Sequence, residues 1–205
     1  MNSLDRIVAK GIKSVLEEDL GKVTYNKVER EVFEVFGMTV LEAVSDFPKI
    51  DLTLRKFFGK HTTNIESKIF KKILSVEKNT KTESTLTIKD PIVAKTIFES
   101  YGDPVKKIIL DILIDNPKSI PETIMASKLP KASAYTRIKE MIQDGLLTMV
   151  GHTSAADGRK INEYAVTFSK ATFEIQSNGM TVNVNMPNKF LKDSFTFNSI
   201  YESTQ

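Results

Sequence analysis

Hydrogen-bonding side chains and long cations gather in the segment 130–144, at spacings that place them on one side of a helix. The polar side carries Lys131, Ser133, Thr136 and Arg137. The opposite side carries Ala134, Ile138, Met141 and Ile142. An apolar stripe at helical spacing packs against the protein and leaves the other side for solvent or a ligand. Such a helix suits the major groove of duplex DNA; the alternative is ordinary helix packing with a solvated face.

The cations of this helix have distinct expected roles. A guanidinium bonds O6 and N7 of guanine together, so Arg137 is the strongest candidate for reading a base. An ion pair with Glu140 or Asp144 is the alternative for the same side chain. Lys131 and Ser133 lie in the first turn, where free backbone N–H groups favour a phosphate. This end of the helix is therefore expected to contact DNA.

A basic hairpin is expected directly after the helix. The apolar period changes from helical to alternating after Gly145, and the strand 161–168 follows a polar tip at 152–160. Arg159 and Lys160 are expected to reach the phosphate backbone or the minor groove, with a merely solvated tip as the alternative. The remaining residues assigned to DNA binding are His152 and Tyr135. His152 would assist at the tip or be incidental there, and Tyr135 would bond a phosphate, pack beneath the hairpin, or do both.

Three short motifs occur in the order of a winged helix-turn-helix. Residues 103–110 (DPVKKIIL) resemble the first helix of archaeal and bacterial winged-helix regulators of the ArsR-like type. Residues 129–138 (LPKASAYTRI) resemble the opening of their recognition helix, and 145–147 (GLL) the turn into the first wing strand. The resemblance covers residues 90–168 and implies a transcriptional regulator that binds double-stranded DNA. No metal response carries over, because the cysteines that sense metals in that family are absent.

The first 76 residues predict a separate all-α bundle. Five helices are expected, with stops at Gly21, Gly37, Pro48 and Gly59. The overall pattern resembles an archaeal helical module of the Nitrosopumilus output-domain kind. That resemblance implies a module without a catalytic role. The bundle is expected to transmit a signal, to bind a protein or small-molecule effector, or to pair subunits. Residues 77–89 are predicted to be a linker, since EKNTKTE at 77–83 is polar and aperiodic.

Residues 169–205 predict a second hairpin and a tail. Asn178-Gly179 between two alternating runs is a strong hairpin signal. The aromatics of the tail are Phe190, Phe195, Phe197 and Tyr201. A docking helix, an interface arm and a frayed end all remain open for this tail. We expect a homodimer, with the second hairpin and the tail as part of its interface.

Composition narrows the function classes. The chain of 205 residues has a net charge of +3 and no cysteine, which excludes disulfides and thiolate metal sites. No catalytic motif, cofactor loop or apolar run of the ~20 residues that span a bilayer is present, so a cytoplasmic protein without enzymatic activity is expected. The predicted fold is mainly α within the α+β class. The alternative function is a protein-interaction or assembly module that does not bind specific DNA sequences.

Overall fold

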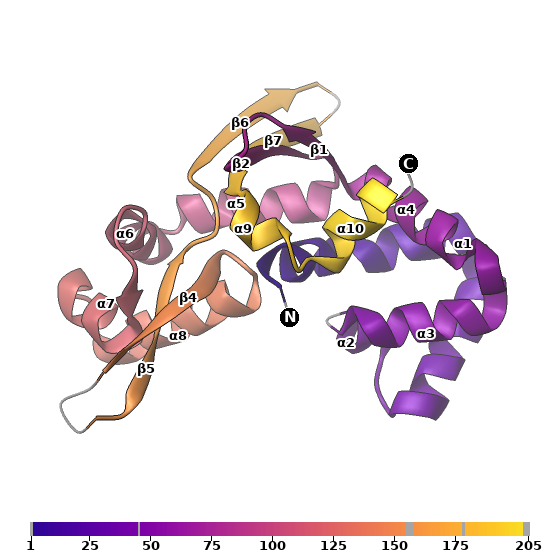
Figure 1. The fold of residues 1–205 in the computed structure, drawn as a ribbon, viewed down its shortest axis with the longest axis horizontal. Coiled ribbons are helices and arrows are strands. Elements are labelled where there is room, and N and C mark those ends of the chain that lie inside the picture. Colours follow the sequence, from indigo (N-terminus) through magenta and orange to yellow (C-terminus); the bar gives the residue numbers. More distant parts are fainter. Residues whose placement is uncertain (1, 45, 155–157, 178, 203–205) are drawn as a thin grey trace.

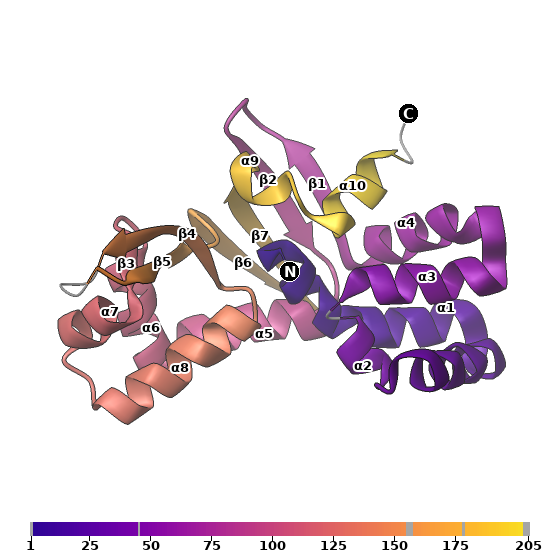
Figure 2. The same ribbon diagram turned by 60° about the horizontal axis from the view of Figure 1, so that its bottom comes forward.

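A four-stranded antiparallel sheet lies across a layer of helices in the computed structural model, which describes residues 2–44, 46–154, 158–177 and 179–202 (Figure 1). The strand order is β1 (Leu74–Lys78), β2 (Glu83–Ile88), β7 (Gly179–Pro187) and β6 (Lys170–Gln176). A mixed α+β fold is therefore confirmed. Two helical groups flank this sheet, with α1–α4 on one side and α6–α8 on the other (Figure 2).

The prediction of a linker at residues 77–89 is wrong, because most of this segment is strand. β2 alternates buried and half-buried side chains, and its Leu86 lies opposite Val184 of β7. β1 begins at Leu74, where helix was predicted, and pairs with β2 as a hairpin. The polar turn at 79–82 shows no hydrophobic pattern that would reveal this hairpin. Its apolar side chains are buried because β2 pairs with β7, about 100 residues further along the chain.

The N-terminal helices end at the predicted residues, with two exceptions. α1 runs over Ser3–Phe36 as one kinked element, since Gly21 departs from helical geometry at φ 71°, ψ 153°. The others are α2 (Val40–Ala43), α3 (Phe47–Phe58), the 3-10 turn η1 (Gly59–His61) and α4 (Thr62–Ile73). Pro48, predicted to stop a helix, instead lies in the first turn of α3, where a missing N–H costs nothing. None of the helices in the described ranges is long and apolar enough to cross a membrane.

Two Asp-Pro pairs start helices. Asp90 caps α5 (Pro91–Gly102), and Asp103 caps α6 (Pro104–Leu113) through hydrogen bonds from Val105 and Lys106 N–H. The chain continues through β3 (Lys118–Ser119), α7 (Ile120–Ser127), α8 (Lys131–Gln143), β4 (Leu147–Ser154) and β5 (Lys160–Val166). The three strands form a second antiparallel sheet in the order β3-β5-β4.

The tail is a docking segment, one of the three alternatives that the sequence left open. It forms α9 (Asn188–Leu191) and α10 (Phe195–Glu202), and the ring of Phe195 lies 4.4 Å from that of Phe47. The β6–β7 hairpin also forms as predicted, with Gln176 opposite Gly179, although Asn178 is outside the described residues. Buried apolar side chains from Leu4 to Ile200 make one connected core.

A buried carboxyl lies between α3 and α4. Glu66 is 2% exposed, and its Oε1 has no hydrogen-bond partner among the described residues. Burial, together with the nearby Asp51 carboxylate, raises the pKa of Glu66 to about 8, against a smaller opposing effect of Arg55. The folded chain therefore binds this proton more tightly than the unfolded chain does.

The stability of the folded protein is expected to fall as the pH rises from about 4.5 to about 8. An acid whose pKa is raised by folding stabilises the protein fully below its unfolded pKa near 4.5, and that stability is lost up to pH 8. The melting temperature should drop by roughly 5 °C or more between pH 5 and pH 8. Glu66→Gln should flatten this slope, whereas Glu34→Gln at an exposed position should retain it. An unchanged slope in Glu66→Gln would contradict the assignment.

Candidate nucleic-acid interface

Helix α8 is held against the protein by one apolar stripe. Ala134, Ile138 and Met141 are buried, and α8 contacts α6, α7 and β4. At 3.6 residues per turn, these three side chains point in one direction, so the opposite side of α8 is left to solvent. The predicted amphipathic helix is therefore confirmed, with its apolar face inward.

The exposed side of α8 differs in part from the predicted one. Its exposed residues are Lys131, Ala132, Tyr135, Thr136, Lys139 and Gln143. Lys139 was missed by the sequence analysis, although its signal was available. It follows Tyr135 by four residues, the spacing that brings side chains together on a helix. The ammonium of Lys139 lies 5.5 Å from the centre of the Tyr135 ring, and Tyr135 is 47% exposed, so its ring is not buried.

Arg137 turns toward α6 and away from the exposed side. Its guanidinium donates a 2.9 Å hydrogen bond to Glu140 and lies 3.5 Å from the carboxylate of Asp103. Lys106 of α6 lies 3.5 Å from Glu140 as well. The structure therefore shows the alternative predicted for Arg137, the ion pair with Glu140, in place of a side chain directed at a base. Asp144, the other predicted partner, pairs with Lys10 of α1 instead.

These four groups form a neutral cluster that joins α6 to α8. The hydrogen bond from Arg137 lowers the pKa of Glu140, with Lys106 adding a smaller effect. The backbone N–H of Lys106 lowers the pKa of Asp103, and Arg137 adds to it. Both carboxylates stay charged at neutral pH, so Arg137 is compensated within the protein.

The first turn of α8 has free backbone donors. Pro130 is its N-cap residue and supplies no side-chain cap. The turn before it bends sharply at Lys128, whose φ of 56° is left-handed. The preceding helix α7 does have a cap, in which Ser119 and Glu122 bond each other's backbone N–H groups. The N–H groups at the start of α8 therefore remain open to an anion such as a phosphate.

The β4–β5 hairpin adds further polar groups to those of α8. His152 and Lys160 are exposed near its tip, on strands that pair with each other, and Arg159 is exposed just before β5. Ser133 is half-buried in the first turn of α8. Residues 155–157, part of the predicted basic tip, are outside the described residues. Figure 1 shows this hairpin extending beyond α7 and α8 at one end of the molecule.

The ion pairs within residues 103–168 leave several lysines unpaired, although the net charge of this segment is small. Residues 103–168 contain nine Lys and Arg against eight Asp and Glu, a net charge of +1. Four of the acids are paired, namely Asp103, Asp111, Glu140 and Asp144. Among the described residues no ion pair involves the remaining lysines, which are Lys118, Lys128, Lys131, Lys139 and Lys160. Lys128, Lys131 and Lys139 thus leave α8 and the turn before it with positive charge that no ion pair with described residues offsets, whereas the hairpin carries Glu163 as well as Arg159 and Lys160.

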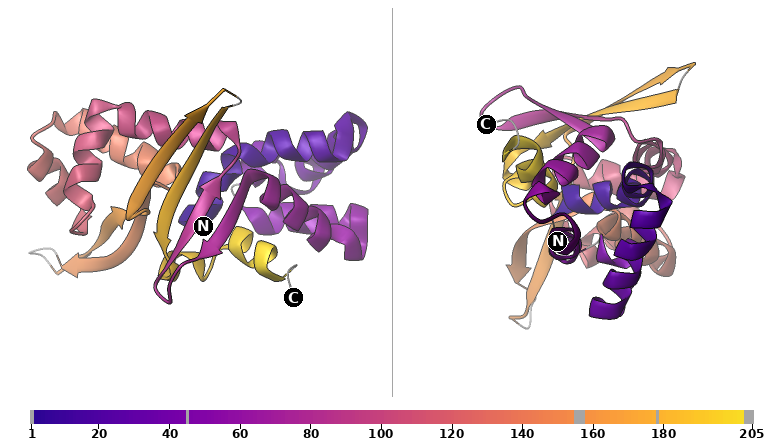
Figure 3. Two further views of the ribbon diagram at one scale, coloured as in Figure 1. Left: turned by 90° about the horizontal axis from the view of Figure 1, so that it is seen from above. Right: turned by 90° about the vertical axis from the view of Figure 1, so that its right-hand side faces the viewer.

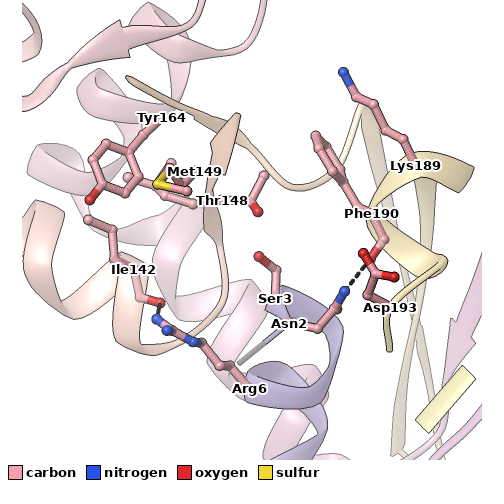
Figure 4. A pocket seen from close by; sticks show the side chains of 11 residues that line it. Asn2, Ser3, Arg6, Ile142, Thr148, Met149, Tyr164, Lys189, Phe190 and Asp193 are labelled. Carbon is pink, nitrogen blue, oxygen red and sulfur yellow. Dashed lines mark hydrogen bonds between the residues drawn. The ribbon is translucent and has the colours of Figure 1, made fainter. Parts of the chain in front are cut away.

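The far end of α8 is fixed by α1. Leu146 N–H bonds Met141 C=O, and Gly145 is left-handed at φ 79°, which together close the helix. Arg6 donates a 2.8 Å hydrogen bond to Ile142 C=O at the same end. Figure 4 shows these groups beside a cavity of about 420 Å³, with Tyr164 on one wall and Phe190 on the other. α1 therefore sets the position of α8 relative to the central sheet.

The groups gathered on the exposed side of α8 can donate hydrogen bonds and carry positive charge. No group of three or more His, Asp or Glu side chains that could hold a metal ion occurs in the ranges that the structure covers. The arrangement offers cations, an aromatic ring, short hydroxyls and free N–H groups on one exposed side. No protein-family model, curated protein or solved structure matches this chain.

Proposed function

We propose that the chain is a DNA-binding transcriptional regulator in which α6, α7, α8 and the β4–β5 hairpin act as a winged helix-turn-helix. The element order helix, short strand, helix, helix and hairpin agrees with the resemblance found in the sequence. In this proposal α8 enters the major groove and the hairpin contacts the backbone or the minor groove.

The exposed side of α8 carries the proposal. Lys131 and Lys139 have no ion pair with described residues, Gln143 offers hydrogen bonds, and the first turn offers free N–H groups. The Thr136 hydroxyl donates to Ala132 C=O and can still accept a hydrogen bond. Glu140, the acid within α8, and Asp144 at its C-cap are both in ion pairs. Binding of a protein partner would not need this separation of charge on α8. Binding of a polyanion does need it.

The experiment begins with selection of duplexes from a random pool by the full chain. The affinity of the best duplex is then measured against salt concentration. Lys131→Gln with Lys139→Gln should weaken binding by about 10- to 100-fold and lower the log–log salt slope by up to ~1.8, two phosphate contacts.

The matched control removes two charges elsewhere. Lys22 and Lys27 are exposed on α1 and have no ion pair within the described structure, so Lys22→Gln with Lys27→Gln makes the same change in net charge. This variant should retain the affinity and the slope. Equal effects of the two pairs would mean that only overall charge matters, and the proposed groove-facing side of α8 would be wrong.

A further inference from the structure

One edge of the central sheet is open. β6 pairs only with β7 among the described strands, and Figure 3 (left panel) shows it as the outer strand on the side of α6–α8. The opposite edge, β1, is short, and its Lys78 lies 4.3 Å from the ring of Tyr201 in the flanking α10. An open strand of seven residues is a template for another strand, which proteins usually cover.

The apolar layer beneath the sheet continues past this edge. Phe173 of β6 packs edge-on against Phe98 of α5, with ring centres 5.4 Å apart. Phe98 is nevertheless 45% exposed, and Ile175, on the same face of β6 as Phe173, is 74% exposed. Both apolar groups would lose solvent contact if one more strand were added beside β6.

The hydrogen-bonding groups of β6 limit how a strand can pair there. Gln176 lies opposite Gly179 as the pair that closes the β6–β7 turn, and bonded pairs alternate along an antiparallel ladder. Gln176, Glu174, Thr172 and Lys170 therefore bond to β7. Ala171, Phe173 and Ile175 direct their N–H and C=O groups to the open side.

The sequence of β6 is complementary to itself in one such register. With Thr172 on a two-fold axis, Ala171 of one copy faces Phe173 of the other, and both direct their backbone groups to the junction. Lys170 then lies opposite Glu174, and symmetry repeats this pair. Cross-strand pairs of opposite charge stabilise a sheet, and like charges destabilise it.

We infer that two copies of this chain pair antiparallel through β6, with Thr172 opposite Thr172, so that the two sheets become one. The interface is isologous, as a two-fold dimer requires. Lys170 and Glu174 select the register, and Phe98, Phe173 and Ile175 become covered. The inference does not depend on DNA, so its failure would leave the proposed function standing.

A single cysteine tests the register cleanly, because the chain has none. Thr172→Cys would place two sulfurs at a non-bonded pair, where Cα atoms are ~4.5 Å apart and a disulfide can form. Mild oxidation of the full chain should yield a covalent dimer. Gln176→Cys is the control, since this residue lies on the same strand and face but far from its symmetry mate. Equal cross-linking of both variants would overturn the register.

Charge exchange tests the same interface without a cross-link. Lys170→Glu and Glu174→Lys should each weaken dimerisation by about tenfold in analytical ultracentrifugation, because each creates two like-charge pairs. The double variant Lys170→Glu with Glu174→Lys should restore the wild-type dimer. A monomeric wild-type chain at high concentration, or a dimer indifferent to all three variants, would overturn the inference.

Discussion

Replacing Gly145 by alanine is expected to destabilise the protein far more than the same change at Gly37. Both glycines end a helix with a positive φ, 79° and 66°, which costs an L-residue ~1–2 kcal/mol. A Cβ at Gly145 would also lie 2.3 Å from the carbonyl oxygen of Ser3, whereas a Cβ at Gly37 meets nothing within 4 Å. The overlap with backbone should add roughly 2 kcal/mol or more.

The measurement is chemical denaturation of the two variants beside the wild type. We expect Gly37→Ala to lose ~1–2 kcal/mol and Gly145→Ala to lose ~3–5 kcal/mol. Both glycines have the same helix-end geometry. The difference between the two losses of stability therefore measures how closely α1 packs against the end of α8. Equal losses would show that α1 does not approach Gly145 as closely as described.

Loss of the Asp5 carboxylate is expected to release the C-terminal helix. Asp5 is buried at the start of α1 and accepts hydrogen bonds from Ser194 Oγ (2.7 Å), Thr196 N (3.0 Å) and Phe195 N (3.1 Å). It thus caps α10 from a distant element, and hydrogen bonds to a charged acceptor are among the stronger ones. Asp5→Ala leaves these donors without a partner and should cost ~3 kcal/mol.

Hydrogen exchange locates this effect. Amides of 195–202 should lose protection in Asp5→Ala, while those of α5 keep most of theirs. Asp193→Asn is the control, since Asp193 is exposed nearby and takes no part in the cap. Uniform loss of protection across the chain, or no loss at all, would contradict a local capping role.

Local signals predicted the helices and the β6–β7 hairpin well, and the β1–β2 half of the central sheet poorly. Asp90-Pro91 and Asp103-Pro104 start helices through their own side chains, so the sequence alone reveals them. The β1–β2 hairpin is stable because β2 pairs with β7, and no local period announces a partner so far along the chain. The same holds for the tail, whose helix depends on Asp5 and Phe47 at the other end of the sequence.

For the candidate site, the residue types were predicted better than the directions in which their side chains point. Helical spacing placed Lys131 and Thr136 on the exposed side, where the structure has them. Arg137 is only one turn from the buried Met141, and acids on α6 and α8 attract its long side chain. Asp103 caps α6, and its second role beside Arg137 could not be predicted because it requires the packing of α6 on α8.

The most direct test maps the contact surface on the protein. Amide chemical shifts of the full chain are recorded with and without a saturating amount of the duplex selected from the random pool. The proposal predicts that the largest changes fall on 131–139 and 152–160, with small ones on α1–α4. Changes centred on α1–α4, or a random pool from which no duplex is enriched at low salt, would contradict DNA binding by α8.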